Sequence, residues 1–225
     1  AKARVQPSIA NPVLFDHTNV HGTVNLLKAC VDAGVKKVVF SSSSSVYGDA
    51  ELPTSESHRL SPQSPYGLQK KIGEEYLELF TQLYDIKGVS LRYFNVYGEG
   101  MPLGGAYATA IGIFLNQRKY DEKITIFGDG EQTRDFTYIN DVVRANILAA
   151  TTDGLGDYEV FNVGNGDNCS VNRIADLIGG DRQHLDPKVE PKATLADNSK
   201  IRQKLGWSPS QSVDKWIPEY KKIIK

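Results

Sequence analysis

The sequence predicts an α/β protein built on a doubly wound parallel sheet, because helical and strand patterns alternate along its first hundred residues. Residues 11–33 carry apolar side chains at helical spacing, and a β-branched run over 35–42 follows Gly34. The same order returns as a helical pattern over 66–84 and a strand pattern over 89–94. Short apolar strands that each follow a helix are typical of parallel sheets covered on both faces.

The chain after Gly98 has a looser pattern, and we expect it to form a smaller α/β lobe over the carboxyl edge of the sheet. Open α/β folds bind their ligands at that edge. We therefore divide the chain into residues 1–98, joined by a strand and helix from about 128–163, and a mainly ligand-binding lobe of 99–225. The further elements expected are helices near 106–117, 140–150, 171–178 and 213–224 and strands near 124–127 and 159–163.

Length, composition and charge limit the class of protein. The 225 residues suffice for one domain with a substantial core, or for one and a half domains. The 26 basic and 27 acidic residues nearly balance, so we expect neither nucleic acid nor an anionic membrane as a partner. No apolar run reaches the roughly 18 residues of a membrane span. Two cysteines without a partner motif favour a reducing cytoplasm over a disulfide scaffold.

Tyr66 and Lys70 stand four residues apart at the start of a predicted helix, so their side chains share one face. A phenol is a poor base at neutral pH, and a nearby ammonium lowers its pKa by favouring the phenolate. Such a pair alone also occurs by chance. The serine run 41–45, directly after a buried strand, adds hydroxyl groups where the sheet binds ligands. The alternative is a serine-rich turn without chemistry, which five serines directly after a buried strand make less favourable.

These residues, together with further motifs, resemble the extended short-chain dehydrogenase/reductase family, the NAD-dependent epimerases and dehydratases that act on nucleotide sugars. The resemblance covers nearly the whole chain, and the order and spacing of the motifs are more specific than any single one. It implies a Rossmann-type NAD-binding domain and a lobe that binds a nucleotide sugar. The matching segments are 1–5, 19–23, 41–48, 64–70, 91–98, 128–136, 196–200 and 205–207.

The resemblance also implies a role for individual residues. Ser43 would bind the reacting sugar oxygen, Tyr66 would accept its proton, and Lys70 would hold the cofactor ribose and lower the Tyr66 pKa. Further cofactor contacts are implied at Asn19, Ser41, Ser42 and Phe94. Contacts to the nucleotide sugar are implied at Asn95, Phe127, Arg134, Lys188 and Thr194.

Three of the substrate positions have a plain structural alternative. Arg134 could be a surface residue paired with Asp135 or Glu131. Asn95 could cap the end of a strand, and Phe127 could belong to the core.

At two predicted substrate positions the residue type bears on what the site can bind. Lys188 stands where relatives carry an arginine that grips the diphosphate, so either Lys188 or Arg182 would have to substitute, and a lysine lacks the bidentate fork. Thr194 corresponds to a position where a bulky aromatic residue excludes N-acetyl groups. A small threonine there predicts that N-acetylhexosamine substrates are tolerated.

The residues after Ser43 favour one reaction of the family. Dehydratases carry an aspartate and a glutamate where this chain has Ser44 and Ser45, and two serines cannot act as that acid–base pair. The resemblance therefore favours a 4-epimerase of UDP-hexoses, in which Tyr66 takes the C4 hydroxyl proton while NAD takes the hydride and returns it to the other face. The alternatives are a dehydratase or reductase of the same family, and a catalytically silent protein that binds a nucleotide sugar.

Three expectations concern what lies outside these motifs. The phosphate-binding motif G-x-x-G-x-x-G is absent from the sequence, and we expect it within roughly 80 residues before Ala1, which would leave the sheet N-terminally truncated and NAD binding weak. The apolar stripes over 20–31 and 72–83 exceed what one sheet face needs, and relatives use these helices for a four-helix homodimer interface. No metal is expected, because His17 and His21 have no third ligand.

Overall fold

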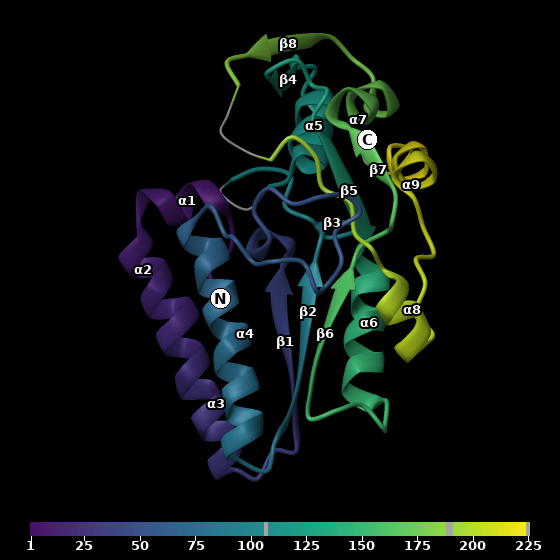
Figure 1. Ribbon diagram of the computed structural model, residues 1–225. Helices are drawn as coiled ribbons and strands as arrows, with labels where there is room; N and C mark the ends of the chain where they lie inside the picture. Colours follow the sequence, from purple (N-terminus) through teal and green to yellow (C-terminus); the bar gives the residue numbers. More distant parts are fainter. Residues whose placement is uncertain (106–107, 188–190, 224–225) are drawn as a thin grey trace.

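A parallel sheet of three strands, in the order β1–β2–β6, lies at the centre of the molecule (Figure 1). The computed structural model describes residues 1–105, 108–187 and 191–223. The register pairs Val39 with Val89 and Val89 with Glu159. All three strands begin and end within two residues of the predicted ranges, and they are β1 (Lys37–Ser43), β2 (Lys87–Tyr93) and β6 (Tyr158–Val163).

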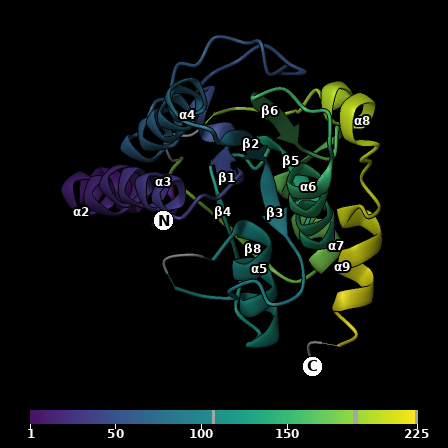
Figure 2. The same ribbon diagram turned by 90° about the horizontal axis from the view of Figure 1, so that it is seen from below.

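Helices cover both faces of this sheet, which confirms the doubly wound arrangement. Figure 2 shows β1 and β2 between the pair α3 (Gly22–Asp32) and α4 (Pro65–Leu83) on one side and α6 (Ile139–Thr151) on the other. Leu27 and Leu77 fill the first interface. The second interface buries a larger set, which also includes side chains of α8 (Ser199–Leu205): Val89, Leu91, Val142, Ala145, Phe161, Ile201 and Trp207.

The helix predicted over 11–33 is interrupted by one wide turn. It divides into α2 (Pro12–Asp16), the π-helical segment η1 (His17–His21) and α3, after a short α1 (Val5–Ala10) that the sequence did not predict. The Gly22 amide donates to the carbonyl of His17, five residues earlier, which the spacing of apolar residues could not reveal.

The second lobe stands above the carboxyl ends of the central strands (Figure 1). In its sheet β3 pairs in parallel with β5, and β5 pairs antiparallel with β7, while β4 and β8 form a separate parallel pair. Its strands are β3 (Asn95–Tyr97), β4 (Ile124–Phe127), β5 (Thr133–Tyr138), β7 (Asn168–Ser170) and β8 (Arg182–Leu185). Its helices are α5 (Ala110–Lys119), α7 (Val171–Ile178) and α9 (Val213–Tyr220).

Several boundaries in this lobe differ from the expectation. The helix expected near 106–117 begins at Ala110, and residues 106–107 lie outside the described part of the chain. The last helix ends at Tyr220. The sequence predicted none of β3, β5, β7 and β8, because they are short or polar and exist only through their pairing partners.

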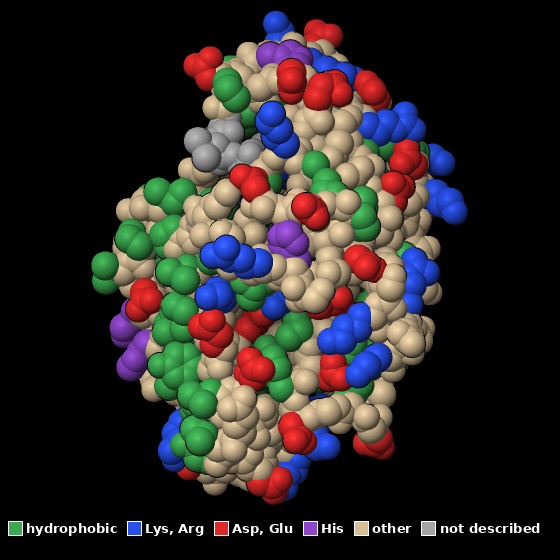
Figure 3. Space-filling model, viewed as in Figure 1, with side chains coloured by type: hydrophobic (Ala, Val, Ile, Leu, Met, Phe, Trp, Pro, Cys, Tyr) green, Lys and Arg blue, Asp and Glu red, His purple; other side chains and the backbone are tan. Residues whose placement is uncertain are grey.

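Apolar side chains gather on the outer surface of α2, α3 and α4 (Figure 3). The apolar side chains expected to form one stripe over 72–83 lie on two sides of the helix. Phe80 packs toward the sheet, whereas Leu79 and Leu83 face solvent. On α3, Leu26 is 62% exposed. We call the exposed set the α2–α4 apolar face, and it comprises Val13, Leu14, Leu26, Leu68, Leu79 and Leu83. None of the helices within the described residues has the length and apolar character needed to cross a membrane.

A buried ion pair joins α4 to the middle of the sheet. Arg92 of β2 donates from Nη2 to Glu74 Oε2 at 2.6 Å and from Nε to Oε1 at 3.0 Å, and the two side chains are 5% and 4% exposed. Ser42 of β1 also donates to the Glu74 carboxylate. Arg92 Nη1 donates to the Tyr47 hydroxyl at 2.9 Å, which donates to Asn162 of β6 at 2.6 Å. The network therefore connects α4 with all three central strands.

Replacing one member of the ion pair tests this role. Glu74→Gln should lower the free energy of unfolding by about 3–5 kcal/mol, because it leaves the buried Arg92 charge uncompensated. Glu75→Gln is the matched control, since Glu75 pairs with Lys71 on the exposed side of the same helix, and its loss should cost at most about 1 kcal/mol. Urea unfolding of both variants measures the difference, and equal losses would contradict the assignment.

Candidate active site

The first turn of α4 carries Tyr66 to the carboxyl end of β1. Ser64 caps the helix by accepting a hydrogen bond from the Gly67 amide at 3.1 Å, and Pro65 occupies the first helical position, where its missing N–H costs nothing. A Cβ atom on Gly67 would lie 2.4 Å from the carbonyl oxygen of Ser45. The absence of a side chain at Gly67 therefore allows the serine-rich turn to pack directly against the helix.

The serine run places a hydroxyl beside the Tyr66 phenol. Ser43 is the last residue of β1 and is followed by the 3₁₀ turn η2 (Ser44–Val46). Its Oγ accepts from the Ser45 amide at 3.2 Å and lies 3.1 Å from the Ser45 Oγ. Burial raises the pKa of Tyr66, whereas a hydrogen bond with Ser43 and the positive charge of Arg4 lower it. Ser43 and Tyr66 thus lie together, as the sequence predicted.

Lys70 lies one turn further along α4 and is buried. Its Nζ donates to the carbonyl oxygen of Ser41 at 2.6 Å and lies 5.1 Å from the centroid of the Phe40 ring and 5.8 Å from that of Tyr66. Burial lowers the pKa of Lys70 to about 8, and the charge of Glu74 opposes that change. The Ser41 side chain is exposed, whereas that of Ser42 faces inward to Glu74.

The surroundings of Lys70 fit the nicotinamide ribose of NAD. An ammonium carries three N–H donors, and within the described residues one of them bonds to Ser41. The other donors suit the hydroxyl groups of a ribose. Lys70 and Tyr66 would therefore hold the nicotinamide half of the cofactor.

Asn19 and Phe94, also predicted to contact the cofactor, are both buried and make contacts within the protein. Asn19 Oδ1 accepts from the Lys2 amide at 2.6 Å, and its Nδ2 donates to the Lys2 carbonyl at 2.8 Å and to Gln69 Oε1 at 3.0 Å. Phe94 packs with Tyr47 in a small core cluster. Asn19 thereby fastens the start of the chain to α4, and a cofactor contact at either position stays a prediction.

The predicted substrate residues lie on the second lobe and at its junction with the sheet. Asn95 is exposed at the start of β3, and Phe127 is half-buried at the end of β4. Arg134 on β5 is only 8% exposed, so the interpretation as a surface residue is wrong. Its Nη1 donates to the carbonyl of Thr133 at 2.8 Å. Lys188 lies outside the described residues.

Asp135 is a buried carboxylate whose structural importance the sequence did not reveal. Its oxygens accept from the backbone amides of Asn165 at 2.7 Å and of Gly166 and Ala196 at 3.0 Å each. Burial raises the pKa of Asp135 to about 6, although these three hydrogen bonds lower it. Its own amide donates to Thr194 Oγ1 at 3.2 Å. Asp135 therefore holds the segment that carries Thr194 against β5.

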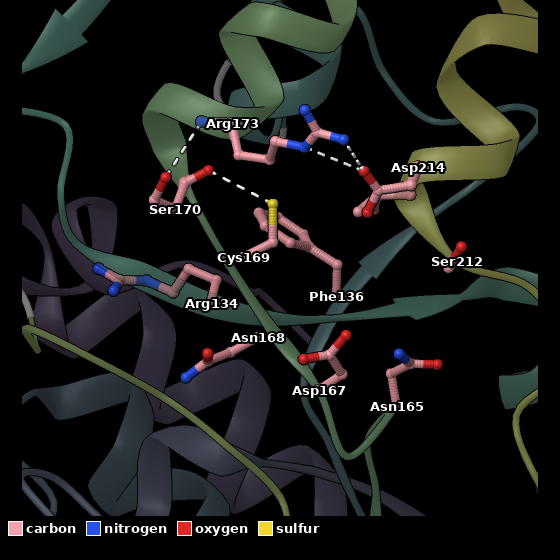
Figure 4. Close-up of a pocket in the computed structure, with 11 residues that line it drawn as sticks. Arg134, Phe136, Asn165, Asp167, Asn168, Cys169, Ser170, Arg173, Ser212 and Asp214 are labelled. Atoms are coloured by element: carbon pink, nitrogen blue, oxygen red, sulfur yellow. Dashed lines mark hydrogen bonds and ion pairs between the residues drawn. The ribbon is translucent and has the colours of Figure 1, made fainter.

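A cavity of about 300 Å³ opens beside β5, β7 and α7 (Figure 4). Figure 4 shows Arg134 extending away from the ion pair of Arg173 and Asp214 at its rim. The lining residues are Arg134, Phe136, Asn165, Asp167, Asn168, Cys169, Ser170, Arg173, Ser212, Val213 and Asp214. Neither Ser43, Tyr66 nor Lys70 lines this cavity, so the proposed chemistry and the cavity are separate.

A serine, a tyrosine and a lysine at the carboxyl edge of a doubly wound parallel sheet define the class of short-chain dehydrogenase-type sites. The model of the NAD dependent epimerase/dehydratase family matches residues 1–164, and the chain belongs to this family.

Individual relatives agree with the family. A putative UDP-glucose 4-epimerase of Methanocaldococcus jannaschii is 39% identical over 217 residues, which cover 93% of this chain and 70% of that protein. A UDP-glucuronate 4-epimerase of Thermodesulfobacterium geofontis is 37% identical over 241 residues, covering all of this chain and 72% of its own length.

Solved structures share the fold. The UDP-N-acetylglucosamine 4-epimerase of Methanobrevibacter ruminantium, in complex with UDP-N-acetylmuramic acid, superposes with a TM-score of 0.91 at 36% identity, covering 99% of this chain and 73% of that one. The UDP-glucose 4-epimerase of Thermotoga maritima, with UDP-glucose, gives a TM-score of 0.90 at 36% identity, covering all of this chain and 76% of that one. The Rossmann-type fold is therefore confirmed.

The buried ammonium of Lys70 predicts that Lys70→Met stabilises the protein near neutral pH. The folded-state pKa of about 8 lies below the ordinary lysine value of 10.5. Because the ammonium is costly to bury, the variant should gain about 1–3 kcal/mol of unfolding free energy at pH 7. That cost is present below the folded pKa and fades as pH rises toward the unfolded value, so the gain should shrink in alkaline buffer. Urea unfolding at both pH values measures it.

The neighbouring Lys71→Met serves as the control for this prediction. Lys71 pairs with Glu75 at the partly exposed surface of the same helix. Its replacement should leave stability nearly unchanged at either pH. A Lys70→Met variant that is less stable than the wild type near pH 7 would contradict the prediction.

Proposed function

We propose that this protein interconverts UDP-hexoses that differ in configuration at C4, with NAD as its cofactor. Relatives that are 37–39% identical over nearly the whole chain are named as 4-epimerases of UDP-glucose and UDP-glucuronate. A UDP-glucuronic acid 4-epimerase of Bacillus cereus, solved with UDP-glucuronic acid and NAD, shares the fold at 32% identity with a TM-score of 0.88. These similarities support the reaction class and the cofactor.

The proposed roles follow from the chemistry of the three side chains. Bound NAD supplies the hydride acceptor and donor at C4 of the sugar. Tyr66 takes the proton from the C4 hydroxyl and returns it, and Ser43 donates a hydrogen bond to the same sugar oxygen. Lys70 holds the ribose, and its charge favours the Tyr66 phenolate.

The observation that carries the proposal is the neighbourhood of Tyr66. Ser43 shares a hydrogen bond with the phenol, and the next turn contributes Ser44 and Ser45, of which Ser45 contacts Ser43. Elimination of water would need a carboxylic acid and a carboxylate in this turn. Hydroxyl groups suit hydrogen bonding to one sugar oxygen while its proton is transferred, which favours an epimerase over a dehydratase.

The nucleotide sugar is proposed to bind across the junction of the two lobes. In this proposal residues 1–98 with α6 and β6 hold NAD, while Asn95, Phe127 and Arg134 hold the nucleotide. Arg134 suits the diphosphate because a guanidinium pairs well with phosphate oxygens. Thr194 is small and half-buried, so we propose that the site accepts an N-acetyl group on the sugar. Lys188 stays a prediction from the sequence.

Loss of the Tyr66 hydroxyl should remove activity. Tyr66→Phe should lower kcat at least about 100-fold, since a positioned acid–base group contributes roughly 10²- to 10⁴-fold. Conversion of UDP-glucose and of UDP-GlcNAc to their C4 epimers, followed by chromatography with added NAD, measures the rate for the 225-residue chain and for any longer product of the same gene.

Tyr84→Phe is the matched control, because Tyr84 lies exposed at the other end of α4. It should keep full activity. If the wild-type protein binds a UDP-sugar but shows no turnover with NAD, the silent binding protein is the correct alternative. Release of a 4-keto-6-deoxy product would identify a dehydratase instead.

We also propose that two copies associate through the α2–α4 apolar face as a four-helix bundle. Side chains such as Leu26 and Leu83, each 62% exposed, gather on this side of the molecule (Figure 3). Large exposed apolar patches are unusual for the surface of a monomer. Identical faces can meet about a two-fold axis, which is the commonest symmetry of homo-oligomers.

A charge on this face should separate the dimer. Leu26→Glu combined with Leu83→Glu should shift the protein from dimer to monomer, because two charges would be buried unpaired at the interface. Ile147→Glu on the far side of the sheet is the control, since Ile147 is comparably exposed on α6. Light scattering after size-exclusion chromatography measures the mass, and a monomeric wild type would refute the interface.

A further inference from the structure

Arg4 has a backbone conformation that residues with side chains rarely adopt. Its φ of 94° and ψ of 135° lie in a region that glycine occupies readily and other residues do not. Such a conformation persists only where the surrounding structure imposes it, and it is frequently found at functional sites. Arg4 precedes α1 and lies within the matching segment 1–5, but the sequence predicted no role for its side chain.

The segment that contains Arg4 is fastened to α4 on both sides. Before Arg4, the backbone of Lys2 is bound by the amide of Asn19, which bonds in turn to Gln69 of α4. After Arg4, the buried Ser8 Oγ accepts a hydrogen bond from the backbone amide of Tyr66 at 3.1 Å. We call residues 2–8 the strap. These two attachments hold the backbone on either side of Arg4 against the first two turns of α4, where Tyr66 lies.

The charge of Arg4 acts on the phenol of Tyr66. Burial lowers the pKa of Arg4 and the Tyr66 phenol raises it, while Arg4 in turn lowers the pKa of Tyr66. Ser43 from β1 is the other group that lowers it, and Lys70 Nζ lies 5.8 Å from the ring centroid. Among the described residues, no charged group of α2 or η1, which also pack near the start of α4, contributes to the Tyr66 shift.

Arg4 differs from Lys70 in keeping its charge at every relevant pH. A guanidinium does not lose its proton in proteins, whereas Lys70, with a pKa of about 8, loses much of its charge in mildly alkaline buffer. The charge of Arg4 therefore favours the phenolate at every relevant pH, including where Lys70 is neutral.

We propose that Arg4 is a positioning residue for the proton transfer at Tyr66, held by the strap so that its permanent charge stabilises the phenolate. Burial raises the pKa of Tyr66, so loss of its proton to solvent is unfavourable near neutral pH, and the charge of Arg4 reduces that cost. The phenolate then takes the proton of the C4 hydroxyl. The part of this inference that concerns turnover rests on the proposed 4-epimerase function. The effect of Arg4 on the ionisation of Tyr66 does not depend on any substrate.

The experiment compares Arg4→Gln with Arg4→Lys. Near-ultraviolet absorption reports phenolate formation, and subtracting the same variant with Tyr66→Phe isolates Tyr66 from the other tyrosines. Arg4→Gln should move the Tyr66 titration to higher pH, because the positive charge that favours the phenolate is gone. Arg4→Lys should restore most of the shift. An unchanged Tyr66 titration in Arg4→Gln would overturn the proposal.

Arg4→Gly separates the charge from the backbone strain. Glycine adopts the positive φ without strain, so this variant should have an equal or higher Tm than the wild type while its Tyr66 titration still moves to higher pH. A Tyr66 titration that stays in place in Arg4→Gly would show that the guanidinium has no effect on the phenol and would overturn the proposal.

Activity provides the second readout. If the protein turns over UDP-glucose, kcat/KM of Arg4→Gln near neutral pH should fall roughly tenfold, a modest share of what a positioned acid–base group contributes. The acid limb of its pH profile should move to higher pH, and Arg4→Lys should recover most of the rate. A rate loss with an unmoved pH profile would mean a merely structural role and would overturn the proposal. If no turnover occurs, the proposed function fails while the Tyr66 titration still decides the role of Arg4.

Discussion

The ion pair of Glu74 and Arg92 is the interaction on which the site depends. Its charges are buried at the contact of α4 with β2, and removal of either partner would leave the other uncompensated. Although burial acts in the opposite direction, the hydrogen bonds that Arg92 donates to Glu74 raise the pKa of Arg92 above its ordinary range. The same carboxylate offsets part of the burial cost of Lys70, one turn earlier on the helix. Glu74 therefore stabilises both the fold and the cation of the proposed site.

Close packing of α4 on β1 brings the residues of the candidate site together. A Cβ atom on Gly67 would meet the Ser45 carbonyl, and one on Gly73 would lie 2.4 Å from the Phe40 ring. Each glycine costs the helix roughly 0.5–1 kcal/mol relative to alanine. In return the helix lies close enough for Lys70 to reach the strand carbonyl of Ser41. The close contact, rather than helix propensity, brings the phenol to the serine hydroxyl.

The central sheet and much of the candidate site could be predicted because their signals are local. Short apolar runs identified all three central strands, and spacing placed Tyr66 and Lys70 on one helix face. The second lobe was less predictable, since β5 and β7 gain stability only by pairing. Asp135 stayed unnoticed for a related reason: its partners are backbone amides of residues 165, 166 and 196, which no side-chain pattern reveals.

By itself the sequence determined the elements of the central sheet, a helix that begins within one residue of Tyr66, and the residue types available for chemistry. The tertiary structure alone decided which charges face Tyr66. Arg4 lies far from Tyr66 in the sequence, and only the attachments of Lys2 and Ser8 bring it there. Electrostatic interactions depend on separation in space and on burial, and neither quantity is contained in residue spacing.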